Sequence, residues 1–356
     1  MRRVRAVAVL WVGLVLIVAG CARSAAPLPL VAVPSPTPAP PVTLPRDAGP
    51  HDALTEWWYY TGHLQAADGQ TYGFEFTVFQ ARRQGAPSGY LAHFAISDIA
   101  GQRFSHQARF VQLTGDAPGM FPIDVDGWTL ATADGGETIE AAMTPGPGVD
   151  RPFGMRLHVR DSKPPALHNG GYIEYGVAGG SYYYSRTRLS VSGTLQTGSG
   201  EGQAVSGEAW MDHQWGNFVV SSGGGWDWYS LQLDDRTELM LYVLRGLNGE
   251  TTGVYGTEVL ADGSVRDLPA GGVTADVLGA WTSPHTGAVY PSGWRLTLPD
   301  GQRLEVWPQI ADQELYFPQL GRELGVGVMA YWEGTVRVSG DRTGVGYVEL
   351  TGYSGR

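Results

Sequence analysis

Three short segments of the chain combine ionisable side chains with aromatic ones. They are "TEWWYYTGHL" (55–64), "GEAWMDHQWG" (207–216) and "GGGWDWYSLQLDD" (223–235). Carboxylates and imidazoles transfer protons, and aromatic faces attract cations or line apolar pockets. Each segment is therefore interpreted either as a strand with one apolar face or as part of a binding site for an apolar molecule.

The side chains of these segments sort onto faces if each segment is a strand, because successive residues point to opposite sides. In the first segment Glu56, Trp58 and Tyr60 share one face, and Trp57, Tyr59 and His63 share the other. In the second, Glu208, Trp210 and Asp212 lie opposite His213 and Trp215. In the third, Asp227 and Tyr229 lie opposite Trp226 and Trp228.

His213 has three possible roles: a proton donor or acceptor, a hydrogen-bonded structural histidine, or a metal ligand. No other His or Cys lies at ligand spacing from it, so we expect no metal site and no cofactor. Glu56 and Glu75 fit either a catalytic role or a structural role as buried acids that hold loops by hydrogen bonds.

The elements that position these residues are strands. Short alternating runs such as "TYGFEFTVFQ", "RLSVSGTL" and "ELMLYVLR" are separated by turn residues, and the chain contains 51 glycines. Asp-Gly pairs at 68–69, 262–263 and 300–301 predict hairpin turns. The pattern predicts a mostly β protein built as an antiparallel sandwich or barrel.

An internal repeat predicts two similar β units. The segment from Trp57 aligns with the segment from Trp226, so that Tyr59 matches Trp228 and Tyr60 matches Tyr229. In this alignment Asp227 takes the place of Trp58. A carboxylate at a position where the other copy has an indole breaks the local pattern, which favours a functional role for Asp227.

The N-terminus predicts a membrane-anchored lipoprotein. Three arginines precede an apolar run that ends in "VAGC", which resembles a bacterial lipoprotein cleavage site and implies lipidation of Cys21, the only cysteine. We expect a signal peptide (1–20), a Pro/Ala-rich tether (21–46) and two domains (47–203 and 204–356). The domains would stand on the extracytoplasmic side of the cell membrane.

Several functions are disfavoured by composition. The net charge of −11 and the single lysine argue against nucleic-acid binding. The sequence contains neither the G-x-S-x-G motif of α/β-hydrolases nor the phosphate-binding G-x-x-x-x-G-K-[ST] motif.

A set of motifs in order resembles the AttH-like family, which includes the carotenoid 1,2-hydratases. The motifs are the three segments above together with "YGFEFTVFQ", "HNGGYIEYGVAGGSYYYSRTRLSVSGTL", "ELMLYVLR", "YWEG" and "GVGYVELTGY". The resemblance covers nearly all of the chain after the tether. It implies two packed lipocalin-like antiparallel β-barrel domains.

The resemblance also implies a reaction, the acid-catalysed addition of water to an isoprenoid C=C bond without a cofactor. This chemistry needs a protonated carboxylic acid, aromatic faces around a carbocation and a group that delivers water. The implied catalytic groups are Asp227, His213, Tyr229 and Trp215. The expected substrate-binding residues are Glu56, Trp57, Trp58, Tyr60, Trp210, Asp212, Trp226 and Trp228. A non-catalytic lipid or carotenoid carrier and another lyase, isomerase or hydrolase remain alternatives.

Overall fold

The structure is a computed structural model that describes residues 40–83, 86–112, 121–174, 179–218, 224–323 and 328–354. Cys21, the expected signal peptide and most of the expected tether lie outside these residues. Within these described ranges, helix is limited to a 3-10 turn (Arg46–Ala48) and α1 (Pro318–Glu323). No helix among the described residues is long and apolar enough to cross a membrane.

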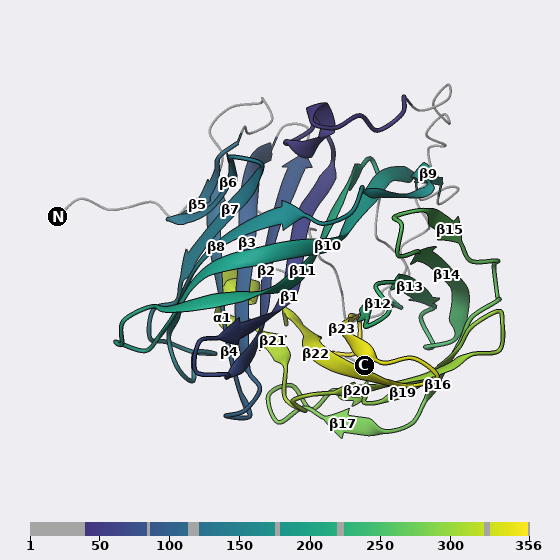
Figure 1. Ribbon diagram of the computed structural model, residues 1–356. Helices are drawn as coiled ribbons and strands as arrows, with labels where there is room; N and C mark the ends of the chain where they lie inside the picture. The colour runs from purple at the N-terminus through teal and green to yellow at the C-terminus, as the bar shows by residue number, and fades with distance from the viewer. Residues whose placement is uncertain are drawn as a thin grey trace, which may run out of the picture.

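The first sheet has eleven strands and curls into a nearly closed barrel (Figure 1). Its strands follow the order β4-β3-β2-β1-β11-β10-β8-β7-β6-β5, and β9 pairs with β10. Their bounds are β1 (Thr55–Ala66), β2 (Thr71–Arg83), β3 (Ala86–Asp98), β4 (Arg103–Gln112), β5 (Ile123–Val125), β6 (Trp128–Ala133), β7 (Gly136–Ala142), β8 (Phe153–Asp161), β9 (Ala166–Glu174), β10 (Gly180–Thr197) and β11 (Gln203–Gly216).

The second sheet has ten strands and forms a half-barrel. Its order is β15-β14-β13-β12-β23-β22-β20-β19-β16, and β21 pairs with β22; β17 (Ala280–Thr282) and β18 (Val289–Pro291) form a separate hairpin. The bounds are β12 (Trp226–Leu233), β13 (Glu238–Arg245), β14 (Thr251–Val259), β15 (Val265–Asp267), β16 (Thr274–Val277), β19 (Trp294–Thr297), β20 (Arg303–Pro308), β21 (Glu314–Tyr316), β22 (Ala330–Gly340) and β23 (Gly344–Leu350).

The three Asp-Gly pairs are hairpin turns, as predicted. They connect β1 to β2, β14 to β15 and β19 to β20, and each glycine has a φ of 86° or 87°. A residue with a side chain is strained at such a φ, so glycine lets the chain reverse there.

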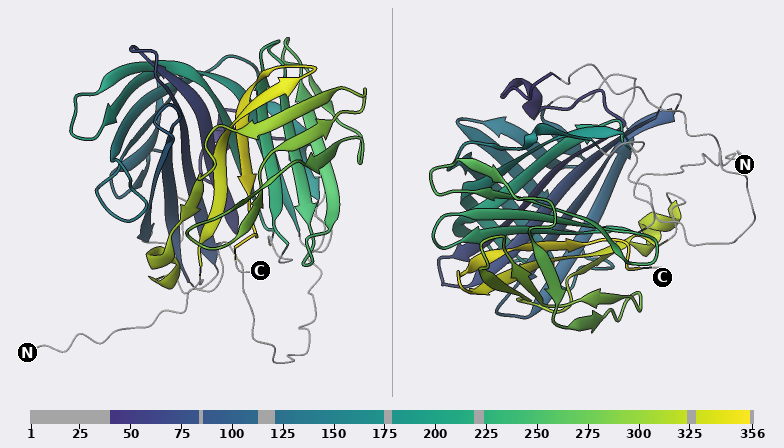
Figure 2. Two further views of the ribbon diagram at one scale, coloured as in Figure 1. Left: turned by 90° about the horizontal axis from the view of Figure 1, so that it is seen from below. Right: turned by 90° about the vertical axis from the view of Figure 1, so that its right-hand side faces the viewer.

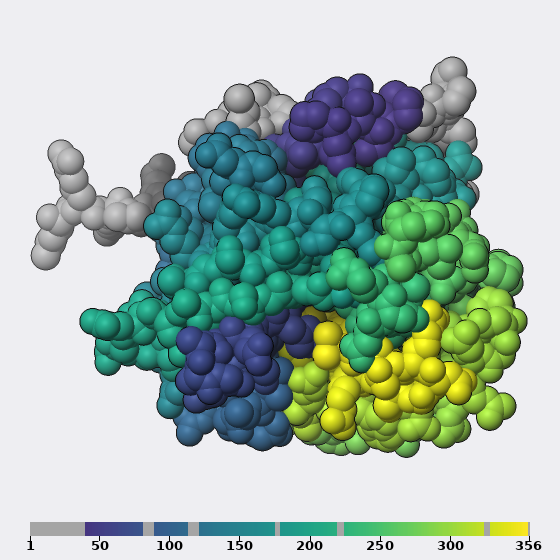
Figure 3. Space-filling view, in the orientation of Figure 1, coloured from purple at the N-terminus to yellow at the C-terminus, as the bar shows by residue number. Residues whose placement is uncertain are grey.

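The two barrels pack side by side, as the ribbon views and the space-filling view show (Figures 2 and 3). Each has its own core, one built around Trp58, Phe74 and Trp128 and the other around Tyr229, Leu241 and Trp294. The prediction of a mostly β protein with two packed antiparallel barrels is confirmed.

The change from one sheet to the other falls later than the expected domain boundary at residue 204. The strand β11, which begins at Gln203, pairs with both β1 and β10 and so completes the first barrel. The second barrel begins at β12. Because β1 is bonded to β2 and β11 while β12 is bonded to β13 and β23, the two aligned repeat segments occupy equivalent places in their barrels.

Candidate active site

The two barrels meet through the outer faces of β1 and β12. Alternation along β1 turns Trp57 and Tyr59 outward, and alternation along β12 turns Trp226 and Trp228 outward, so the four join one cluster. Tyr59 meets Trp228 edge to face with ring centroids 5.1 Å apart. The Nε1–H of Trp228 donates to the hydroxyl of Tyr183, at 3.2 Å. An aromatic layer therefore joins the barrels.

Four carboxylates without an ion-pair partner among the described residues lie within this interface. Glu75 on β2 and Asp212 on β11 come from the first barrel, and Glu333 on β22 and Glu349 on β23 come from the second. Glu75, Asp212 and Glu333 are buried, and Glu349 is partly exposed. Glu333 and Glu349 are directly opposite each other on paired strands. Such a pair is unfavourable when both groups are ionised.

Hydrogen bonds from aromatic side chains hold the acids of the second barrel. The hydroxyl of Tyr59 donates to Oε1 of Glu333 at 2.6 Å, and the Nε1–H of Trp226 donates to Oε2 of Glu349 at 2.8 Å. The hydroxyl of Thr77 donates to Oε1 of Glu75. The second oxygens of Glu75 and Glu333 have no hydrogen-bond partner among the described residues. Those two oxygens are therefore buried polar atoms whose hydrogen-bonding capacity is unused among the described residues.

Asp212 differs from the other three acids because its oxygens are well supplied with donors. Tyr183 and the indole of Trp210 each donate to it at 2.6 Å, and Ser185 donates as well. Its hydrogen bonds fix the rings of Tyr183 and Trp210, so we assign it a positioning role.

One further carboxylate in the same interface, Glu238, differs from these four because it forms ion pairs. Glu238 on β13 is fully buried, and it binds Lys163 at 2.8 Å and Arg188 at 2.6 Å. Two cations from the first barrel thus compensate one buried carboxylate. Glu75, Glu333 and Glu349 form no ion pair with a cation among the described residues.

Burial therefore sets the protonation of the acid cluster, defined as Glu75, Asp212, Glu333 and Glu349. Loss of water raises the pKa of Glu75 to about 8, that of Glu349 to about 7 and that of Asp212 to about 6. The pKa of Glu333 lies well above its ordinary value because of burial and the nearby charges of Glu349 and Glu75. Glu75 and Glu333 therefore stay protonated near neutral pH, whereas Glu349 is partly ionised and Asp212 mostly ionised.

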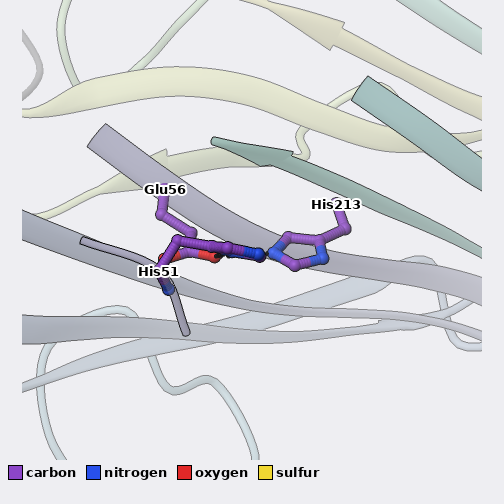
Figure 4. Close-up of side chains that lie close together, drawn as sticks. All are labelled: His51, Glu56 and His213. Atoms are coloured by element: carbon purple, nitrogen blue, oxygen red, sulfur yellow. Dashed lines mark hydrogen bonds and ion pairs between the residues drawn. The ribbon is translucent and has the colours of Figure 1, made fainter. Parts of the chain in front are cut away.

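A different cluster lies within the first barrel, at the start of β1 (Figure 4). Oε1 of Glu56 lies 2.7 Å from Nδ1 of His51 and 2.8 Å from Nε2 of His213. The ring of His51 stacks on Trp215 with centroids 4.1 Å apart, and His213 stacks on Trp58 at 4.8 Å. The histidines hold the pKa of Glu56 below its ordinary value despite its burial, and burial lowers the pKa of His213.

The sequence-predicted residues divide among three places. His213, Trp215, Glu56 and Trp58 lie together in the first barrel, where Tyr60 is also buried. The interface between the barrels contains Trp57, Trp210, Asp212, Trp226 and Trp228. Tyr229 lies in the core of the second barrel. In all three segments, the side chains that were predicted to share a strand face do share one in the structure.

Asp227, one of the implied catalytic groups, does not lie with His213. It lies in the second barrel, where the guanidinium of Arg245 donates to its Oδ1 at 2.9 Å and Tyr353 donates to it at 3.0 Å. A guanidinium stabilises the carboxylate anion, whereas the predicted reaction needs the protonated acid. The expectation that Asp227 and His213 are catalytic groups of one site is therefore corrected, because the two residues belong to different barrels.

Sequence reasoning missed Glu333, Glu349 and Tyr59. A signal was present in the motifs "YWEG" and "GYVEL", where one acid interrupts an apolar strand. An acid at such a position is buried if both faces of the strand are covered. Only the packing of the second barrel on the first covers the outer face.

Comparisons with known proteins agree with the fold. A solved AttH protein from Nitrosomonas europaea is 30% identical, with a TM-score of 0.79 over 90% of this chain and 100% of that one. Kievitone hydratase from Nectria haematococca shares the fold at 15% identity, with a TM-score of 0.67 over 87% of this chain and 93% of that one. No curated protein matches the chain in sequence. The family model described as AttH-like matches residues 35–353, and the chain therefore belongs to the AttH-like family.

Proposed function

We propose that the protein is a cofactor-independent hydratase that adds water to a C=C bond of an apolar, isoprenoid-type substrate at the acid cluster between the barrels. The observation that carries the proposal is Glu75, a buried carboxylic acid with a pKa of about 8 and one oxygen without a partner among the described residues. Hydration of an isolated alkene begins with protonation, and a weak acid kept neutral by burial is suited to supply that proton.

The proposed reaction uses two acids whose pKa values differ. The proton of Glu75 passes to one alkene carbon, which leaves a tertiary carbocation and the Glu75 carboxylate. Water attacks the cation, and its released proton goes to the carboxylate of Glu349, whose pKa of about 7 leaves it partly ionised at neutral pH. Return of that proton to Glu75 restores the starting state. The substrate gains one H and one OH.

The aromatic layer would stabilise the carbocation. Indole and phenol faces attract positive charge, and Trp228 and Tyr59 lie in edge-to-face contact next to the acids. Glu349 and Trp226 are hydrogen-bonded to each other and both are partly exposed, so they mark one edge where the interface meets solvent. We assign substrate and water entry to that edge.

Turnover tests the proposal directly. Purified protein is incubated with lycopene- or γ-carotene-type substrates, and the products are analysed by mass spectrometry for the gain of one water. A hydrated product supports the hydratase. Tight binding without a product would show a carrier instead, and a product of unchanged mass would show an isomerase.

We also propose that the protein is a lipoprotein at the extracytoplasmic face of the cell membrane, anchored through Cys21. An anchored hydratase could take one end of an apolar substrate directly from the bilayer. Metabolic labelling with a fatty acid should mark the wild-type protein and leave Cys21→Ser unlabelled and soluble. Equal labelling of the two proteins would contradict the anchor.

A further inference from the structure

We propose that His51, Glu56 and His213 bind one divalent transition-metal ion in the first barrel. One donor atom from each residue lies within 4.8 Å of the others. Two imidazole nitrogens and one carboxylate oxygen suit Zn²⁺ and its neighbours in the first transition row, whereas Ca²⁺ and Mg²⁺ prefer oxygen ligands. This inference is independent of the proposed hydratase.

The three donors come from rigid and well-supported positions. Glu56 lies near the start of β1, and His213 lies on β11, the strand paired with it. The segment that carries His51 is tied down because Gln80 donates to the carbonyl of His51 at 2.9 Å, and the indole of Trp58 donates to the carbonyl of Ala48 at 3.0 Å. Little rearrangement is then needed to place the donors around one ion.

The other polar atom of each ligand already has a partner. Nδ1 of His213 lies 3.2 Å from the hydroxyl of Tyr184, and Nε2 of His51 lies 3.6 Å from Oδ1 of Asp47. Oε2 of Glu56 accepts from Gln80 and from the backbone N–H of His51. Metal-binding histidines and carboxylates in proteins are typically oriented by such outer contacts. The metal-facing atoms are thereby left pointing at one another.

Charge also suits a cation. Neutral imidazole nitrogens and a carboxylate oxygen are the forms that bind a metal ion, and the three residues supply two of the first and one of the second. Oε1 of Glu56 bonds to both rings, so an ion would replace the two bridging protons. Three protein ligands leave a fourth position for water, and the partly exposed ring of His51 lies at the solvent side of the group.

Metal binding by the full chain provides the test. Protein treated with a chelator is dialysed against Zn²⁺, and bound metal is counted by mass spectrometry. We expect one ion per chain in the wild type and a loss of affinity of at least about tenfold in His51→Ala and in Glu56→Gln. His285→Ala is the matched control, because the exposed pair of His285 and Asp312 also brings an imidazole and a carboxylate within 2.9 Å.

A second measurement keeps the test decisive if a buried substitution disturbs folding. Co²⁺ added to the wild type should give the intense visible absorption of a four-coordinate site, and His51→Ala, which changes a partly exposed ring, should remove it. Stoichiometric Zn²⁺ binding that is unchanged in His51→Ala, or no binding to the wild type, would overturn the proposal. Loss of binding in His285→Ala alone would assign the metal to the surface pair instead.

Discussion

Glu333 and Glu349 face each other on paired strands between the two barrels, and each is held by an aromatic donor, Tyr59 for the first and Trp226 for the second. The contact between Tyr59 and Glu333 joins residues that are 274 positions apart in the sequence. Two opposed carboxyl groups without a cation are tolerated when at least one keeps its proton. The packing of the barrels thus produces the protonated acids on which the proposed chemistry depends.

The acid cluster should make the protein less stable as the pH rises. Glu75 keeps its proton in the folded state up to about pH 8, whereas the unfolded chain loses it near 4.5. The stabilisation of the folded state by the Glu75 proton is complete below about pH 4.5 and is lost as the pH rises to about 8. The free energy of unfolding falls by at most about 1.4 kcal/mol for each pH unit in this range. Urea unfolding at pH 5 and pH 8 should show the decline in wild type and a smaller one in Glu75→Gln. Identical pH dependence in both proteins would exclude Glu75 as its source.

The aromatic layer should account for much of the free energy that holds the barrels together. Trp228 is buried between Tyr59 and Trp210, and truncation of a buried tryptophan costs about 3–5 kcal/mol. We expect Trp228→Ala to lower the free energy of unfolding by about that amount in a urea titration. Trp307→Ala, on a residue that is 40% exposed, is the control and should cost about 1 kcal/mol or less. Equal losses would place the stabilisation elsewhere.

Asp227 should matter for stability rather than for proton transfer. Asp227→Asn removes the anion paired with the buried guanidinium of Arg245, and breaking a buried ion pair on one side costs about 3–5 kcal/mol. Replacing both partners, as Asp227→Asn with Arg245→Met, should recover part of the loss. If folded Asp227→Asn protein lost all hydration activity while its stability was unchanged, Asp227 would return as the proton donor.

The alternating pattern and the Asp-Gly turns were sufficient to predict the β class, three hairpins and the grouping of side chains on each strand. The repeat predicted equivalent places for Trp58 and Asp227. Both side chains lie on the strand face that points into their own barrel. The partners of Asp227 could not be predicted, because Arg245 and Tyr353 surround it only after β13 and the C-terminal segment fold against β12.

The position of His51 was also beyond sequence reasoning. It precedes the first strand in a segment without periodicity, and its contact with Glu56 requires the chain to turn back over the barrel. Which strand face is inward cannot be derived from alternation when both faces are aromatic, as they are in "TEWWYYTGHL". Both faces of this strand are buried because the second barrel packs on its outer face. No local sequence pattern predicts that packing.

The most direct measurement compares hydration rates of Glu75→Gln and wild type in D₂O on the same isoprenoid substrate. Gln keeps the shape of Glu75 but has no acidic proton, so kcat should fall by about 10²–10⁴-fold while the remaining product carries deuterium on the protonated carbon. Glu140→Gln, on a partly exposed residue paired with Arg156, is the control and should keep the wild-type rate. A folded Glu75→Gln protein that hydrates the substrate at the wild-type rate would contradict the assignment of Glu75 as the acid.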